Sequence, residues 1–262
     1  MAGERMQEKT LKLCVLGHNI KYTLSPKVHS ALFEFLGERG EYGVCDVSLH
    51  ELGGAVKKLM SEYDGFNVTK PYKEAVAELF GHVGPVNTVC RDGRCTSTDA
   101  EGFFGDYEAA FGTPNGRILL LGAGGAAKSV AEALSKIENV QTFVFNRTYE
   151  KAKEFSRYGA VAVKSAEGIY DAVINCTSLG LGGEQAAPAE LEFGGVKFAY
   201  DLIYSPPVTP FLESAAKAGA KTCNGLGMLV RQAIAAHEFW RGENFSSSVK
   251  KSMVEFISAR IK

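Results

Sequence analysis

Apolar and polar positions along this chain repeat with the period of a strand and of a helix in turn. The short apolar run KLCVLG (12–17) is typical of a buried strand. In the segment that follows Ser25-Pro26, the apolar residues Val28, Leu32, Phe35 and Leu36 are spaced as on one face of a helix. This order predicts a strand followed by a helix.

The same order recurs up to about residue 100. YGVCDVS (42–48) predicts a strand, and the stripe that follows it predicts a helix through Leu52, Val56, Leu59 and Met60. GFNVT (65–69) and KEAVAELF (73–80) form another such pair. NTVCRDGRCTST (87–98) predicts a hairpin around Asp92-Gly93.

After about residue 100 the alternation starts again. RILLLG (117–122) predicts a strand, and the next helix has one apolar face through Ala127, Val130, Leu134 and Ile137. Further strands are predicted at QTFVFNR, YDAVINC and KFAYDLIY, and a terminal amphipathic helix through Val249, Met253, Phe256 and Ile257. Strands that alternate with helices in this way predict parallel sheets, so we expect two α/β domains.

The overall charge gives no sign of a nucleic-acid or membrane partner. Lys plus Arg number 29 against 30 Asp plus Glu, a formal net charge of -1. The sequence has no apolar run of the ~20 residues that a membrane span requires, and the charged start MAGERMQEKT lacks a signal-peptide core. We therefore expect a soluble, cytoplasmic protein.

The six cysteines are scattered, without a CxxC pair or a histidine at metal-ligand spacing. We predict no metal site and reduced thiols. Cys90 and Cys95 flank the hairpin turn and could face each other across it.

Residues 122–127, Gly-Ala-Gly-Gly-Ala-Ala, fit the G-x-G-x-x-G/A pattern between a predicted strand and helix. The first glycine permits a tight turn, the second lets backbone N–H groups approach a pyrophosphate, and the small last residue lets the helix pack on the strand. The pattern predicts a dinucleotide at the N-terminal end of the helix.

The next predicted strand ends in FNRT (145–148). An NAD site usually has Asp or Glu at this place, which binds the ribose hydroxyls. Arg147 instead offers bidentate hydrogen bonds to a 2′-phosphate, and Lys151 adds a charge one helical turn later. We predict NADP as the cofactor.

Nine blocks, in order along almost the whole chain, resemble the shikimate dehydrogenase family. They are TLSPKVHSALFEFLG, NVTKPYKEAV, GPVNTV, TDAEGF, LLLGAGGAAKSV, FNRT, INCTSLG, YDLIYSPPVTPFL and NGLGMLVRQA. The resemblance implies an N-terminal α/β substrate-binding domain (1–99, completed by helices from about 232 to 262) and a C-terminal Rossmann NADP-binding domain (100–231). It places the active site in the cleft between them.

The resemblance also implies an activity. Family members catalyse the reversible, NADPH-dependent reduction of 3-dehydroshikimate to shikimate, in the chorismate pathway of aromatic amino-acid biosynthesis. They occur as monomers and as homodimers. The catalytic pair of the family matches Lys73 and Asp99.

Other site residues follow from the resemblance by motif position. The groups that bind the substrate match Thr23, Ser25, Asn67, Thr69, Asn87, Asp99, Tyr204 and Gln232. Those that bind the cofactor match Gly122, Ala123, Gly124, Gly125, Ala126, Asn146, Arg147, Thr148, Lys151, Thr177, Ser178, Gly225 and Met228.

Side-chain alternation distinguishes Lys70 from Lys73. A strand through residues 66–70 directs Asn67 and Thr69 to one face and Lys70 to the other, and Pro71 then ends it, which puts Lys73 in the first helical turn. Reduction of a ketone produces an alkoxide that must be protonated, a task for a group that exchanges its proton. The helix end disfavours the ammonium charge and Asp99 would stabilise it, and the residues alone leave open which effect dominates.

Four positions depart from the family pattern: Thr23, Lys70, Ser97 and Asn224 stand where serine, an apolar residue, asparagine and aspartate are usual. The Thr23 methyl would change the space around C1, where quinate carries a hydroxyl. Alternatives are therefore a quinate/shikimate dehydrogenase that uses NAD and a dinucleotide-binding regulator without catalysis. The presence of both catalytic residues favours an enzyme, and the motifs of methylenetetrahydrofolate dehydrogenase, which has a similar plan, are not the ones matched.

Overall fold

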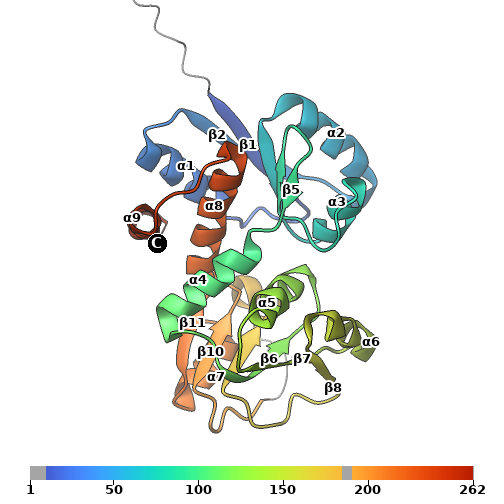
Figure 1. Cartoon of the computed structure of the whole chain (residues 1–262), viewed down its shortest axis with the longest axis vertical. Coiled ribbons are helices and arrows are strands. Elements are labelled where there is room, and N and C mark those ends of the chain that lie inside the picture. The colour runs from blue at the N-terminus through green and yellow to red at the C-terminus, as the bar shows by residue number, and fades with distance from the viewer. Residues whose placement is uncertain (1–9, 185–190, 262) are drawn as a thin grey trace, which may run out of the picture. The chain divides into compact units, whose positions relative to one another are not determined.

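The computed structural model describes residues 10–184 and 191–261, so the charged segment 1–9, in which we expect no signal peptide, lies outside the described residues. Two compact units are present (Figure 1): the first ends at Ser97 and resumes at Ala233, and the second is Thr98–Gln232. Among the described helices, none is long and apolar enough to cross a membrane.

The first unit contains a five-stranded sheet in the order β2-β1-β3-β4-β5. Its strands are β1 (Leu11–Gly17), β2 (Gly40–Asp46), β3 (Gly65–Val68), β4 (Thr88–Cys90) and β5 (Cys95–Thr96). The first three are parallel, whereas β4 and β5 are antiparallel to their neighbours. The expectation of a parallel sheet was therefore only partly right for this unit: β1, β2 and β3 are parallel, and the predicted hairpin at Gly93 adds an antiparallel edge.

Helices cover both faces of this sheet. They are α1 (Ser25–Leu36), α2 (Leu52–Glu62), α3 (Lys73–Leu79), the part of α8 (Leu226–Arg241) from Ala233 onward, and α9 (Ser247–Arg260), with a 3-10 turn at Leu49–Glu51. Leu52, Val56 and Leu59 of α2 pack with Cys14, Leu16 and Phe66 of the sheet in one buried cluster. The predicted face of α2 is thus confirmed, with Met60 at its margin.

The predicted face of α1 was only partly right. Val28 and Leu32 are fully buried, but His29 and Phe33 complete the buried face, while Phe35 and Leu36 are half-buried. Phe35 instead meets Phe256 of α9 edge-on, with ring centroids 5.3 Å apart. The helix therefore packs against α9 as well as against the sheet. In α9, Met253 and Ile257 are buried as predicted, but Val249 is exposed.

The second unit contains a six-stranded parallel sheet in the order β11-β10-β9-β6-β7-β8. Its strands are β6 (Gly116–Leu121), β7 (Val140–Phe145), β8 (Val161–Val163), β9 (Ala172–Asn175), β10 (Phe198–Asp201) and β11 (Lys221–Asn224). Its helices are α4 (Asp99–Phe111), α5 (Gly125–Ser135), α6 (Tyr149–Lys153), α7 (Pro210–Lys217) and the start of α8, with 3-10 turns at Glu154–Tyr158 and Leu181–Gly183. The two outermost strands, β8 and β11, were not predicted.

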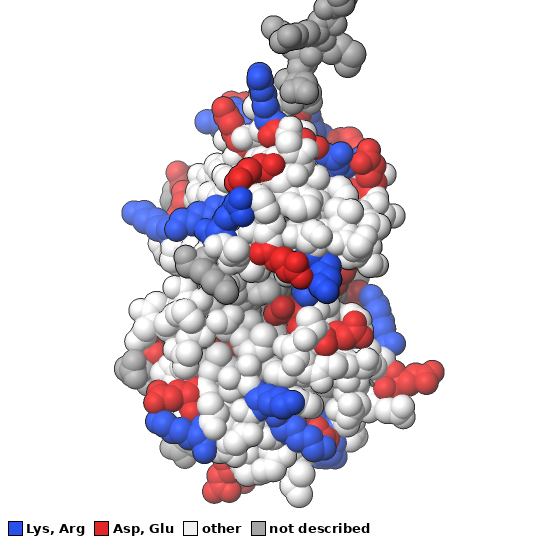
Figure 2. Space-filling view, turned by 90° about the vertical axis from the view of Figure 1, so that its left-hand side faces the viewer, with Lys and Arg blue, Asp and Glu red and all other residues white. Residues whose placement is uncertain are grey.

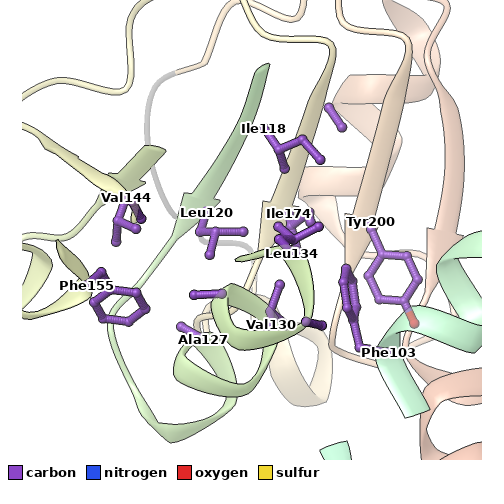
Figure 3. Packing of buried hydrophobic residues seen from close by; sticks show 14 of the residues in the cluster. Phe103, Ile118, Leu120, Ala127, Val130, Leu134, Val144, Phe155, Ile174 and Tyr200 are labelled. Carbon is purple, nitrogen blue, oxygen red and sulfur yellow. The ribbon is translucent and has the colours of Figure 1, made fainter. Parts of the chain in front are cut away.

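The core of this unit lies on both faces of the sheet. On one face the α5 side chains Ala127, Val130 and Leu134 point at the strands, as predicted (Figure 3). They pack against Ile118, Leu120, Val144, Ile174, Phe103 and Tyr200. On the other face, α7 contributes Phe211, Leu212 and Ala215. A sheet buried on both faces explains why its strands are continuous apolar runs.

The hairpin register answers the question raised by Cys90 and Cys95. Cys95 lies opposite Val89, and the Cys90 N–H donates to the Arg94 carbonyl (2.8 Å). The two cysteines are therefore not in facing positions. All six cysteines are described and are free.

Candidate active site

The glycine turn lies where the strand order of the second sheet reverses. β6 is followed by β7 on one side and paired with β9 on the other, so the carboxyl ends of β6 and β9 form a topological switch point. Gly122 has φ 101°, and a Cβ added there would lie 2.9 Å from Cγ2 of Thr177 in the loop after β9. The two loops are therefore in contact, and Gly122 has both a conformational and a steric reason to be glycine.

The space in front of α5 fits a dinucleotide pyrophosphate. Gly124 is the N-cap of α5, and a Cβ built on it would meet no atom within 4 Å. A larger residue would fill this opening at the positive end of an eleven-residue helix. Ala127 is fully buried beneath it, as the motif requires.

A chain of buried hydrogen bonds supports the loop after β9. Nδ2 of Asn175 donates to Oδ1 of Asp201 (3.0 Å), and Oδ1 of Asn175 accepts from the Thr177 N–H (2.9 Å) and hydroxyl (2.8 Å). Asp201 also accepts from the Thr209 hydroxyl (2.6 Å) and the Ile203 N–H (3.0 Å). Burial raises the pKa of Asp201, and these hydrogen bonds lower it. The motifs INCTS and YDLIY are thus parts of one network, which sequence reasoning did not identify.

Exposed cations follow β7. Arg147, Thr148 and Lys151 are exposed, and Nδ2 of Asn146 donates to the Thr148 carbonyl (2.9 Å), which fixes the turn into α6. Lys153 pairs with Glu150 (2.9 Å), whereas neither Arg147 nor Lys151 forms an ion pair with a described acidic residue. This end of β7 can therefore bind an anion such as a phosphate.

The start of α8 holds two further predicted residues. Gly225 lies against the Leu202 carbonyl, where a Cβ would clash, and Met228 is buried. Asn224, where the family has aspartate, accepts from the Leu226 N–H (3.1 Å) and donates Nδ2 to the Pro207 carbonyl (2.9 Å). A carboxylate could accept but not donate, so this departure gains one bond.

Asp106, buried in α4, was missed by sequence reasoning. It accepts from the Tyr200 hydroxyl (2.7 Å) and lies 3.6 Å from Nε of Arg231. Burial raises its pKa, although Tyr200 and Arg231 both act to lower it. Asp106 shares the buried face of α4 with Gly102, Phe103 and Tyr107, but its charge alone gave no signal of burial.

Asp99 and Gln232 belong to this second unit. Asp99 is the first residue of α4 and is buried, and Nε2 of Gln232 donates to the Leu229 carbonyl (2.8 Å). The Thr98 hydroxyl donates to the Gln232 carbonyl (2.9 Å), which ties α4 to α8. Tyr204 is half-buried in the loop after β10, and Ser178 is exposed after β9.

In the first unit, two hydroxyls meet at the start of α1. The Thr23 hydroxyl donates to Oγ of Ser25 (3.0 Å), and the Ser25 N–H donates to Oγ1 of Thr23 (3.2 Å). Leu24 is the N-cap, so Ser25 is not a side-chain cap. Hydroxyls beside the N-terminus of a twelve-residue helix suit a carboxylate.

Asn67 and Asn87 meet at the carboxyl end of β3. Nδ2 of Asn67 donates to the Asn87 carbonyl (3.0 Å) and to Oγ1 of Thr88 (3.1 Å), and the Thr88 hydroxyl donates to Oδ1 of Asn87 (2.9 Å). Thr69 follows the strand and is half-buried. The structure therefore gathers neutral donors and acceptors, as a site for a polyhydroxy ligand requires.

Lys70 and Lys73 differ in their surroundings. Lys70 is exposed, and its ammonium lies 5.3 Å from the centroid of the Tyr22 ring. Lys73 is half-buried and is the first residue of α3, as predicted. The Lys70–Pro71 peptide bond is cis.

Charged side chains elsewhere form small mixed groups. Figure 2 shows lysine and arginine interspersed with aspartate and glutamate over the face drawn, as the formal charge of -1 suggests. Within the described residues, no group of three His, Cys, Asp or Glu side chains could hold a metal ion.

A parallel sheet with a glycine turn at its switch point, in one chain with a second α/β unit bearing hydroxyl and amide groups, defines the class of dinucleotide-dependent dehydrogenases. Comparison with known families agrees with this class. The family model described as "Shikimate dehydrogenase substrate binding domain" matches residues 15–89, and "Shikimate / quinate 5-dehydrogenase" matches residues 108–178. The chain belongs to the shikimate dehydrogenase family.

Individual relatives agree along most of the chain. The shikimate dehydrogenase (NADP(+)) of Caldanaerobacter subterraneus is 38% identical over 257 residues, which cover 88% of this chain and 91% of the relative. The Thermus thermophilus shikimate 5-dehydrogenase, solved with NADP(H) and shikimate, is 33% identical with a TM-score of 0.80, covering 95% of this chain and all of the other. A 5-ketofructose reductase from Gluconobacter is 30% identical with a TM-score of 0.76, over 95% and 99% of the two chains.

Proposed function

We propose that this protein catalyses the reversible reduction of 3-dehydroshikimate to shikimate with NADPH. The observation that carries the proposal is the 38% identity, along 88% of the chain, to an enzyme named shikimate dehydrogenase (NADP(+)). The exposed Arg147 after β7, which forms no ion pair with the acidic residues that the structure describes, supports NADP rather than NAD.

The cofactor would be held by residues of the second unit. The turn Gly122–Ala126 with Thr177 and Ser178 would bind the pyrophosphate region, and Gly225 and Met228 would hold the nicotinamide. Asn146, Arg147, Thr148 and Lys151 would bind the adenosine phosphate. When bound, NADPH supplies the hydride that reduces the substrate ketone.

Lys73 is the proposed proton donor. It would protonate the oxygen of the reduced carbon and, in the opposite direction, accept the proton of the hydroxyl. Asp99 would accept a hydrogen bond from the substrate and orient the lysine. Its burial at the start of α4 gives it a fixed position for this task.

The remaining substrate contacts follow the chemistry of each group. The Thr23 and Ser25 hydroxyls would bind the carboxylate, together with Tyr204. Thr69, Asn67, Asn87 and Gln232 would bind the ring hydroxyls. The four side chains proposed for the ring hydroxyls are neutral, which suits hydroxyl groups because these carry no charge.

Initial rates test the proposal. Shikimate and quinate are each assayed with NADP+ and with NAD+, and 5-ketofructose is assayed with NADPH. We expect shikimate with NADP+ to give the largest kcat/KM, at least about tenfold above NAD+, since one phosphate interaction contributes roughly 1.4 kcal/mol. A larger value for quinate with NAD+, or for 5-ketofructose, would assign the protein to a different activity of the same fold. Absence of turnover with all three, despite NADP+ binding, would favour a regulator.

A further inference from the structure

The amide of Asn67 is bonded by the protein on three sides. Besides its two donor bonds to the Asn87 carbonyl and to Oγ1 of Thr88, its Oδ1 accepts from the Tyr42 hydroxyl at 2.7 Å. An amide nitrogen carries two N–H groups, so both donors of Asn67 are used within the protein. The oxygen has one lone pair left.

The orientation of this amide follows from its partners. The Asn87 carbonyl can only accept, so the Asn67 group that faces it must be the nitrogen. The oxygen must then face Tyr42, and the Tyr42 hydroxyl must be the donor of that bond. An amide rotated by 180° would set two oxygens against each other.

Tyr42 is itself held in place. Its ring is stacked on that of His29, with centroids 3.8 Å apart and planes 8° from parallel, and His29 is fully buried. Burial raises the pKa of Tyr42 well above its usual value, so the hydroxyl keeps its proton. The donor that faces Asn67 is therefore permanent at any physiological pH.

We propose that Tyr42 is a positioning residue for Asn67, whose two donors are occupied by Asn87 and Thr88 and which therefore offers a ligand only an acceptor. The ligand group at Asn67 is then a hydroxyl, which can donate, rather than a carbonyl or a carboxylate. Resting on the proposed function, this inference assigns Asn67 to a ring hydroxyl that the reaction does not change. The reacting carbon is a ketone in one of the two compounds and could not donate to Asn67 in that form.

Steady-state kinetics of Tyr42→Phe test the inference. This substitution removes the hydroxyl and retains the ring that stacks on His29. The matched control is Tyr72→Phe, because the Tyr72 hydroxyl likewise donates a part-buried bond of 2.7 Å, but to the Val47 carbonyl. We expect Tyr42→Phe to lower kcat/KM for shikimate about three- to tenfold, the effect of one neutral hydrogen bond. The KM for NADP+ should remain unchanged, and Tyr72→Phe should stay within about twofold of wild type.

Two substrate analogues separate positioning from a general loss of structure. In 4-deoxyshikimate and 5-deoxyshikimate, one hydroxyl that the reaction does not change is absent. With one of the two analogues, Tyr42→Phe and wild type should have equal kcat/KM, because the hydroxyl that Asn67 accepts is missing. In an Asn67→Ala background, Tyr42→Phe should likewise have no further effect on shikimate oxidation.

Three results would overturn the inference: no loss with shikimate, an equal loss with shikimate and both analogues, or an undiminished loss in Asn67→Ala. Failure of the wild type to oxidise shikimate would remove the proposed function separately. Shikimate binding to the same variants, followed by Trp240 fluorescence, would then decide the role of Tyr42: weaker binding in Tyr42→Phe alone supports it, and equal or absent binding overturns it.

Discussion

Acid should destabilise the first unit, because this unit buries two neutral histidines side by side. Nδ1 of His29 lies 3.0 Å from Nε2 of His237, and both side chains are at most 1% exposed. Burial lowers the pKa of His237 from 6.5 to about 4. Burial, with the nearby His237, lowers the pKa of His29 well below 6.5.

The sign and size of the effect follow from proton binding. Below about pH 6.5 the unfolded chain binds protons at these histidines and the folded chain does not, so stability is lost as the pH falls toward 4. His237 alone should lower the free energy of unfolding by about 2 kcal/mol between pH 8 and pH 5. His29 acts in the same direction. Buried Asp106 and Asp201, whose pKa values are raised, act in the opposite direction.

Urea unfolding at pH 8 and pH 5 measures this effect, and a variant isolates the histidines from the carboxylates. Trp240 is the only tryptophan of the chain, and its ring lies 5.5 Å from that of His237, so its fluorescence reports on the first unit. In His237→Gln the loss of stability between the two pH values should shrink by about 2 kcal/mol. His82→Gln, at an exposed position, should keep the wild-type loss. An unchanged pH dependence in His237→Gln would refute the reasoning.

Three further substitutions, two of them with a control variant, test the site and the network that supports it. Lys73→Ala should lower kcat roughly a hundredfold or more, the size expected for a positioned proton-transfer group, while Lys70→Ala should change it little; equal losses would contradict the difference between the two lysines. Arg147→Ala should raise the KM for NADP+ about tenfold without changing NAD+ use, and Lys153→Ala, which removes a cation already paired with Glu150, should not. Asp201→Asn should lower the free energy of unfolding, measured in urea, by about 2–4 kcal/mol. The Asp201 carboxylate accepts hydrogen bonds from buried donors on Asn175, Ile203 and Thr209, and an asparagine amide would have to point its N–H group at one of them. A loss under about 0.5 kcal/mol would argue against the network.

Periodicity predicted most of the secondary structure because most elements here bury a single face. The stripes of α2 and α5 and the apolar runs of β6 and β9 each reflect one packing surface. The method failed for α1, which meets both the sheet and α9. It also missed β8 and β11, which are short edge strands with mostly exposed or half-buried residues and so carry no alternation.

Motif position brought the candidate site residues to notice, but not the groups that hold them. Tyr42 lies 25 residues from Asn67, and Asn175 lies 26 residues from Asp201. Asn175 and Asp201 face each other on the neighbouring strands β9 and β10, whereas Tyr42 of β2 and Asn67 of β3 meet across the intervening strand β1. Both contacts depend on assembly of the sheet, a tertiary event without a local pattern. A buried tyrosine or aspartate therefore resembles any other strand residue until the sheet is assembled.

The position of Arg147 has a consequence for protein engineering. The Arg147 and Lys151 side chains, which follow β7, are exposed, whereas the loop after β9 is anchored in the interior through Asn175 and Asp201. Under the proposed function, coenzyme preference can thus be changed at the exposed end of β7 without disturbing the loop proposed to bind the pyrophosphate. A few substitutions at these exposed positions should therefore change coenzyme preference with little loss of stability.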